Sequence, residues 1–172
     1  IEELLEEMNR RVQNSADTSL KRQLAMIVER RALPAKRRGF TQKAKINGQA
    51  LFLRTGEYND GTLGEIFIDM AKEGATMRSM LNCFAISISI GLQYGVPLRA
   101  LVDKFSHTRF EPSGFTKNPE IPIAKSITDY IFRWLASKFL SQEEKQAVGV
   151  VLRELIPLAK ARYMSNQRRD RA

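Results

Sequence analysis

The chain has 172 residues, of which 43% are hydrophobic, and it carries a formal net charge of +9. This length predicts one domain, or one domain with appended helices, and the hydrophobic content excludes a disordered chain. The excess of lysine and arginine favours an acidic partner such as nucleic acid, a nucleotide, an anionic membrane face or an acidic protein. The single cysteine, Cys83, excludes an internal disulfide framework and a cysteine-rich zinc site.

A single cysteine also suits a reducing cytoplasm, and the chain shows no signal peptide. The most apolar run, 80–96, is short for a membrane span and contains Asn82 and Gln93. We therefore predict a cytoplasmic protein with no membrane partner. Because the sequence starts with Ile1 inside a charged helical pattern, we also expect it to be a piece of a longer chain.

The first part of the chain predicts two amphipathic helices, at 1–13 and 18–31, because apolar residues recur at helical spacing. A basic linker, "ALPAKRRGF", follows and contains Pro34 and Gly39. We predict three parts: an N-terminal helical extension at 1–32, an α+β domain at 33–140, and a C-terminal helix with a basic tail at 141–172.

The hydrophobic period then changes from helical to alternating. Strands are expected at 41–46, 49–58 and 63–70, because "TQKAKI" and its successors alternate apolar and polar residues. Asn47 and Gly48 form the strongest two-residue hairpin signal, and 59–61, "NDG", predicts the second turn. These signals predict a three-stranded antiparallel meander, which needs a covering layer because a small open sheet is not stable alone.

The expected cover is a long helix from Thr76 to Tyr94, apolar nearly all round and therefore buried, with Cys83 as a small buried hydrophobe. Thr76 is a candidate cap, and Gly95 followed by Pro97 ends the helix. The fold class is thus α+β, with additional helices at both ends. The expected core comprises Leu51, Leu53, Ile66, Ile68, Leu81, Phe84, Ile88, Leu92, Leu101, Phe105, Ile131 and Trp134.

Further helices are expected at 97–105 and 123–140, separated by a proline-rich loop. Ser141 and Glu144 predict a capping box for a last helix at 142–164, which Pro157 should kink.

The loop between these helices holds the only histidine, His107, with Arg109 and Glu111 nearby. A histidine near neutral pKa is a candidate acid or base, with Glu111 or Asp103 as its orienting partner. The favoured interpretation is architectural: His107 bonds a loop carbonyl, and Arg109 and Glu111 form an ion pair that stiffens the loop. No nucleophile motif or metal-ligand spacing accompanies the histidine, so we predict no catalytic residue and no metal site.

Two other groups are candidates for binding anions. The turn at Lys72, Gly74 and Thr76 precedes a helix, whose backbone amides attract anions, although it lacks the full glycine spacing of a phosphate loop. A second group, the basic cluster at the start of the domain, is a candidate nucleic-acid patch. It comprises Lys36, Arg37, Arg38, Lys43 and Lys45. The alternative interpretations are a tight turn that needs glycine, and solvated lysines that protect an edge strand.

Three stretches carry a family resemblance: "GEIFIDMAKEG", "LQYGVPL" and "KFSHTRFEPSGFTKNPEIPIAKSITDYIFRWL". Residues 33–140 resemble the C-terminal region of adenosylcobalamin-dependent (class II) ribonucleotide reductases. Residues 40–112 are also similar to the TSCPD domain, named for its Thr-Ser-Cys-Pro-Asp motif. Where that domain often reads Arg-Cys-Pro, this chain has Phe110 and Glu111.

The resemblance implies a part in reducing ribonucleotides to deoxyribonucleotides for DNA synthesis. In the family, the reactive cysteines lie in a large barrel that nothing here matches, so no catalytic residue transfers to this chain. We therefore expect an accessory subunit or C-terminal module, without its own cofactor, that docks on a catalytic subunit holding adenosylcobalamin. Residues 103–125, with His107, Arg109 and Glu111, are the expected docking loop. The alternative is a stand-alone module that binds nucleic acid or a nucleotide.

Overall fold

The computed structural model describes residues 3, 6–7, 10–11 and 29–157. The chain divides into two compact units, Ile1–Arg31 and Ala32–Ala172, and the second contains every element discussed below. The two expected N-terminal helices lie largely outside the described residues, and the basic tail lies wholly outside them. The three-part division of the chain stays a prediction.

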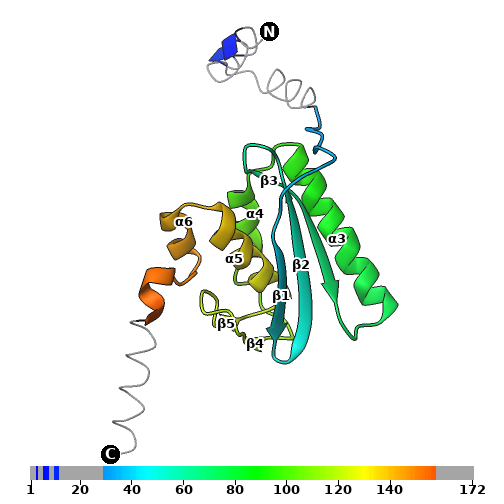
Figure 1. The fold of residues 1–172 in the computed structure, drawn as a ribbon, viewed down its shortest axis with the longest axis vertical. Helices are drawn as coiled ribbons and strands as arrows, with labels where there is room; N and C mark the ends of the chain where they lie inside the picture. The colour runs from blue at the N-terminus through cyan, green and yellow to red at the C-terminus, as the bar shows by residue number, and fades with distance from the viewer. Residues whose placement is uncertain (1–2, 4–5, 8–9, 12–28, 158–172) are drawn as a thin grey trace, which may run out of the picture. The chain divides into compact units, whose positions relative to one another are not determined.

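The expected meander is present in the second unit (Figure 1). Strands β1 (Thr41–Ile46), β2 (Gln49–Glu57) and β3 (Leu63–Met70) form an antiparallel sheet in the order β1-β2-β3. Asn47 and Gly48 have φ angles of 47° and 85°, the pair of positive values that a two-residue hairpin turn requires. The predicted hairpin is thus confirmed. Alternate residues bury one face of the sheet: Ala44, Ile46, Leu51, Leu53, Ile66, Ile68 and Met70.

The long helix α3 (Ala75–Gln93) follows the sheet and runs alongside β3 (Figure 1), so the predicted α+β fold class is confirmed. Ser89 and Gln93 lie on its buried side. The Ser89 hydroxyl accepts a hydrogen bond from the backbone N–H of Ile66 at 2.9 Å, and the Gln93 amide donates to the carbonyl of Gly64 at 3.0 Å. These side chains satisfy backbone groups of an edge strand that would otherwise lack partners.

The expectation that this helix is buried all round was wrong. Its buried residues are confined to one stripe that includes Ile88 and Leu92, whereas Cys83, Met80 and Ile86 are exposed. The helix also begins at Ala75 with Gly74 as its N-cap, so Thr76 is not the cap. Among the described helices, α3 alone is long and apolar enough to span a membrane, a weak indication that core helices also give.

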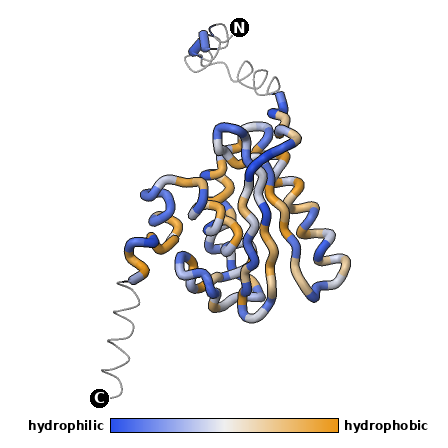
Figure 2. The backbone as a smooth tube through the Cα atoms, in the orientation of Figure 1, coloured by the Kyte–Doolittle hydropathy of each residue, from blue (hydrophilic) through white to orange (hydrophobic). Residues whose placement is uncertain are grey.

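The helix that is buried nearly all round is α5 (Ile127–Phe139). Tyr130, Phe132 and Leu135 have 0% exposure, and Phe132 meets Phe84 and Phe105, the latter on α4 (Leu98–Phe105). Figure 2 shows hydrophobic segments along the strands and along α3 and α5. Of the predicted core, Leu81, Phe84, Leu101 and Phe105 are partly buried against the cluster and the other members are buried, so the core prediction is confirmed.

The capping box of Ser141 and Glu144 is also confirmed, and it opens α6 (Gln142–Ala147). The prediction of one continuous helix through 164 was wrong, because α6 ends at Ala147 with Val148 as its C-cap, and Gly149 adopts a φ of +73°. Positive φ interrupts a right-handed helix, and glycine adopts it at little cost. A short 3-10 helix, η1 (Arg153–Leu155), follows, so Pro157 does not lie inside α6.

Candidate functional site

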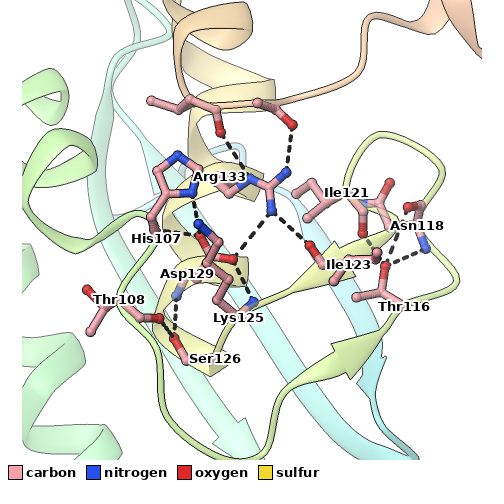
Figure 3. A network of polar contacts seen from close by, with 12 residues as sticks. His107, Thr108, Thr116, Asn118, Ile121, Ile123, Lys125, Ser126, Asp129 and Arg133 are labelled. Atoms are coloured by element: carbon pink, nitrogen blue, oxygen red, sulfur yellow. Dashed lines mark hydrogen bonds and ion pairs between the residues drawn. The ribbon is translucent and has the colours of Figure 1, made fainter.

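The loop before α5 is organised around one buried carboxylate, Asp129, which has 0% exposure (Figure 3). Its oxygens accept hydrogen bonds from the backbone N–H groups of His107 at 2.6 Å and Lys125 at 2.8 Å. Asp129 therefore joins the start of the loop to its end. Buried carboxylates need such donors, because an unpaired buried charge is strongly destabilising.

Arg133 lies one helical turn after Asp129 and is the second charged residue of this buried network (Figure 3). Its Nη1 lies 3.3 Å from Asp129 Oδ2, and its guanidinium donates to three backbone carbonyls. These are the carbonyls of Ile123 at 2.9 Å, Val148 at 3.1 Å and Gly149 at 2.6 Å. The buried ion pair thus ties together the loop, α5 and the segment after α6.

Two hydroxyl side chains fix the rest of the loop. Ser126 caps α5 by accepting from the Asp129 N–H at 3.0 Å, and its hydroxyl donates to the Thr108 carbonyl at 2.6 Å. The Thr116 hydroxyl donates to the carbonyl of Ile121 and accepts from the N–H of Asn118 at 3.1 Å. Hydrogen bonds between residues of the loop therefore fix its conformation.

His107 does not have the geometry of a catalytic base. Its Nδ1 lies 3.7 Å from Asp129 Oδ1, which is beyond hydrogen-bond distance. Neither predicted orienting partner serves it: Asp103 pairs with Arg99 at 2.8 Å, and Glu111 accepts from the N–H and hydroxyl of Ser113 at 2.9 and 2.8 Å. The predicted bond from His107 to a loop carbonyl is replaced by a bond from its backbone N–H to the Asp129 carboxylate, which holds the loop to α5.

The expected ion pair between Arg109 and Glu111 is replaced by that Ser113 contact. The Ser113 hydrogen bonds lower the pKa of Glu111, and the charge of Arg109 adds a smaller effect. Two short strands, β4 (Gly114–Phe115) and β5 (Ile123–Ala124), pair with each other. β4 lies in the predicted loop, whereas β5 occupies the start of the helix predicted at 123–140, which begins instead at Ile127. Phe115 and Ile123 face each other across this pair and are 78% and 52% exposed. The loop is therefore rigid within and apolar at its rim.

The state of His107 gives the first testable prediction. Burial, followed by the positive charge of Lys125, lowers its pKa below the usual 6.5. As the pH falls below 6.5, the unfolded chain binds the proton before the folded protein does, so stability decreases until the folded pKa is passed. We expect His107→Asn, which tolerates the positive φ of 64°, to remove this decrease. Urea unfolding of both proteins between about pH 5 and 8 measures how the free energy of unfolding depends on pH. The same pH dependence in both proteins would show that His107 is not its source.

The turn proposed to bind anions lies between β3 and α3. Lys72 adopts a φ of 65°, and Gly74 caps α3 without a side-chain hydrogen bond. Nearby, the amide of Gln49 donates to the carboxylate of Glu73 at 3.0 Å. Anion binding by Lys72, Gly74 and Thr76 stays a prediction.

The five predicted basic residues do not form one patch. Lys36, Arg37 and Arg38 line a cavity of about 390 Å³ beside Tyr58, and Arg37 forms an ion pair with Glu65. Lys43 and Lys45 lie instead on β1, on the solvent face of the sheet. The linear cluster in the sequence is therefore divided between two surfaces.

Sequence reasoning missed Asp129 and Arg133, the residues on which the loop depends. Their signal was present: an acid and a base four residues apart on a helix whose other positions are mostly apolar, in "ITDYIFRWLASKF". Neither residue has a route to substrate in this geometry, because Asp129 is fully buried and Arg133 is 8% exposed. Within the described residues, no group of three or more histidine, cysteine or acidic side chains could hold a metal ion.

These features define a small α+β module with an internally hydrogen-bonded loop and an exposed apolar rim. The chain belongs to the TSCPD domain family, whose model matches residues 26–139. It is similar to a segment of vitamin B12-dependent ribonucleotide reductases. The protein of that name from Bradyrhizobium diazoefficiens is 57% identical over 115 residues, which are 66% of this chain and 9% of the relative.

Two further relatives of the same name agree with this. The Rhodopirellula baltica protein is 52% identical over 112 residues, which are 65% of this chain and 11% of the relative. The Streptantibioticus cattleyicolor protein is 45% identical over 121 residues, which are 70% of this chain and 20% of the relative. The chain thus spans only 9–20% of the length of these relatives. No solved structure matches it.

Proposed function

We propose that this chain is an accessory subunit or C-terminal module of a class II ribonucleotide reductase in the cytoplasm, and that it is not catalytic alone. The observation that carries the proposal is the 57% identity to a segment of a vitamin B12-dependent reductase that makes up only 9% of that protein. The remaining part of such an enzyme would hold adenosylcobalamin and reduce the ribonucleotide.

The surface of the module supports docking. Phe110, Phe115 and Ile123 are large apolar side chains exposed on a loop that the Asp129–Arg133 pair holds rigid. A rigid loop loses little entropy on binding, and exposed aromatic residues supply much of the energy of protein interfaces. The docking loop of residues 103–125 therefore contacts the catalytic part, with β4 and β5 at its centre.

A chimera tests the proposal at the level of the whole enzyme. The matched 115 residues of the Bradyrhizobium diazoefficiens protein are replaced by the corresponding part of this chain, and deoxyribonucleotide formation is measured with adenosylcobalamin present. We expect the chimera to reduce ribonucleotides and this chain alone to give no product. Deoxyribonucleotide produced by this chain alone would contradict the proposal.

Docking is tested with the same relative after deletion of its matched segment. The purified 172-residue chain is expected to bind the shortened protein, and the double variant Phe115→Ala with Ile123→Ala to bind on the order of 30-fold more weakly. Isothermal titration calorimetry measures the affinities. Phe67→Ala, which removes a different exposed ring on β3, is the matched control and should bind like the unmodified chain. An equal loss of affinity in the double variant and in Phe67→Ala would show that the loop is not the docking surface.

A further inference from the structure

The face of the sheet opposite the core carries two exposed aromatic rings. Phe52 on β2 and Phe67 on β3 are 39% and 43% exposed. In the strand register Phe52 pairs with Asp69, and Phe67 pairs with Arg54, so the two rings occupy diagonal positions on neighbouring strands. Diagonal side chains on one sheet face lie about 7–8 Å apart. The two rings are thus neighbours on an open surface.

Each ring has its own cation from the adjacent strand. Lys43 Nζ lies 5.4 Å from the centroid of Phe52, and Arg54 Cζ lies 5.3 Å from the centroid of Phe67. Strand pairing produces both contacts, because Lys43 is opposite Phe52 and Arg54 is opposite Phe67. The surface therefore contains two copies of the same arrangement, in which a positive charge lies beside an aromatic ring.

The two acids on this face, Asp69 and Glu65, are already paired, and Glu65 forms its ion pair with Arg37. Arg78 on α3 donates to both carboxylate oxygens of Asp69, at 2.9 and 3.0 Å. Lys45 adds a further positive charge on the exposed side of β1. The face is therefore basic as a whole, and an anionic ligand meets no uncompensated carboxylate there.

A cavity of about 670 Å³ lies over this face, between the sheet and the first turns of α3. Its lining includes Phe52, Arg54, Phe67 and Asp69 from the sheet, with Arg78 and Asn82 from the helix. This volume is in the range of small-ligand sites, and the Asn82 amide supplies both a donor and an acceptor.

We propose that this sheet face binds single-stranded nucleic acid, with two successive bases stacked on Phe52 and Phe67 and the adjoining phosphates beside Lys43 and Arg54. Aromatic rings on an open sheet, interleaved with cations, bind unpaired bases because every base has a flat face. Two ring-and-cation pairs, rather than one, favour a strand over a free nucleotide. This inference is independent of the proposed reductase role.

The test is fluorescence anisotropy of a labelled strand of about 12 deoxythymidines with the complete 172-residue chain, at about 50 mM salt. Phe52→Ala and Phe67→Ala should each lower the affinity about tenfold, because each removes one stacking platform. Phe67→Tyr keeps a flat ring and should keep the affinity. Phe115→Ala removes an exposed ring on another surface and should have no effect.

A matched pair of charge variants separates this site from general attraction to a basic protein. Lys43→Gln with Arg54→Gln should weaken binding and reduce its salt dependence. Lys36→Gln with Arg38→Gln removes the same charge from a different surface and should weaken binding less. Circular dichroism confirms that each variant is folded.

Three outcomes would overturn the proposal. The first is no binding of the strand at low salt. The second is an equal effect of both charge pairs with no effect of either phenylalanine variant, which is the behaviour of non-specific attraction. The third is displacement of the strand by deoxythymidine monophosphate at the same concentration of nucleotide units, which would indicate a free-nucleotide site. None of these three outcomes changes the result expected from the chimera experiment, which tests the reductase role separately.

Discussion

Replacing Asp129 with alanine is expected to destabilise the folded protein by about 3–5 kcal/mol. The change removes the acceptor for two backbone N–H groups and leaves the guanidinium of Arg133, which is 8% exposed, without its ion-pair partner. An uncompensated buried charge is far more destabilising than the intact pair is stabilising, since both ions have already lost their hydration. The free energy of unfolding in urea measures the effect.

Asp103→Ala is the matched control for this prediction. Asp103 also pairs with an arginine four residues away on a helix, at 2.8 Å from Arg99, but its side chain is 51% exposed. Water screens that pair, so we expect a loss of only about 0.2–1 kcal/mol. A loss below about 1 kcal/mol for Asp129→Ala would show that the buried pair does not organise the loop.

Phe132→Ala is expected to have an effect of similar size, about 3–5 kcal/mol, through loss of packing. The ring has 0% exposure, stacks on Phe105 at a centroid distance of 4.8 Å and meets the edge of Phe84 at 6.2 Å. Its removal leaves a cavity between α3, α4 and α5 that their backbones cannot fill by small shifts.

Phe115→Ala is the matched control, because it removes the same side chain from an exposed position. Its ring is 78% exposed on β4, so its removal should change the free energy of unfolding by no more than about 0.5 kcal/mol. The same variant is expected to weaken docking on the reductase. A stability loss for Phe115→Ala close to that of Phe132→Ala would mean that the exposed rim belongs to the core of the fold.

The local elements of this protein were predictable because their signals lie within a few residues. Asn47 and Gly48 specify a hairpin by their tolerance of positive φ, and Ser141 with Glu144 caps a helix through bonds that span one turn. Alternation and helical spacing then placed the strands and most of the core. The same kind of pattern gave a wrong prediction for the burial of α3. A helix that is uncharged over most of its length need not be covered on every side. Cys83 is exposed for that reason.

The extent of the last helix was misjudged because the pattern of apolar residues continued past the place where the backbone turns. Gly149 adopts a positive φ there, and the carbonyls of Val148 and Gly149 accept hydrogen bonds from Arg133. The end of α6 is thus coupled to a residue that lies some fifteen positions earlier in the chain. Such a contact has no local signature.

The fold class, the hairpin, most of the core and the relationship to ribonucleotide reductases can be predicted from the order of the amino acids. Which charged residues act together depends on how the chain folds in three dimensions. Antiparallel pairing places Lys43 beside Phe52 and Arg54 beside Phe67, although neither pair is adjacent along the chain. Packing of the loop on α5 makes Asp129 the acceptor for the backbone N–H of His107, whereas Glu111 and Asp103 bond to other residues. Burial explains the difference, because a charge removed from water requires a partner in space, whatever their separation in sequence.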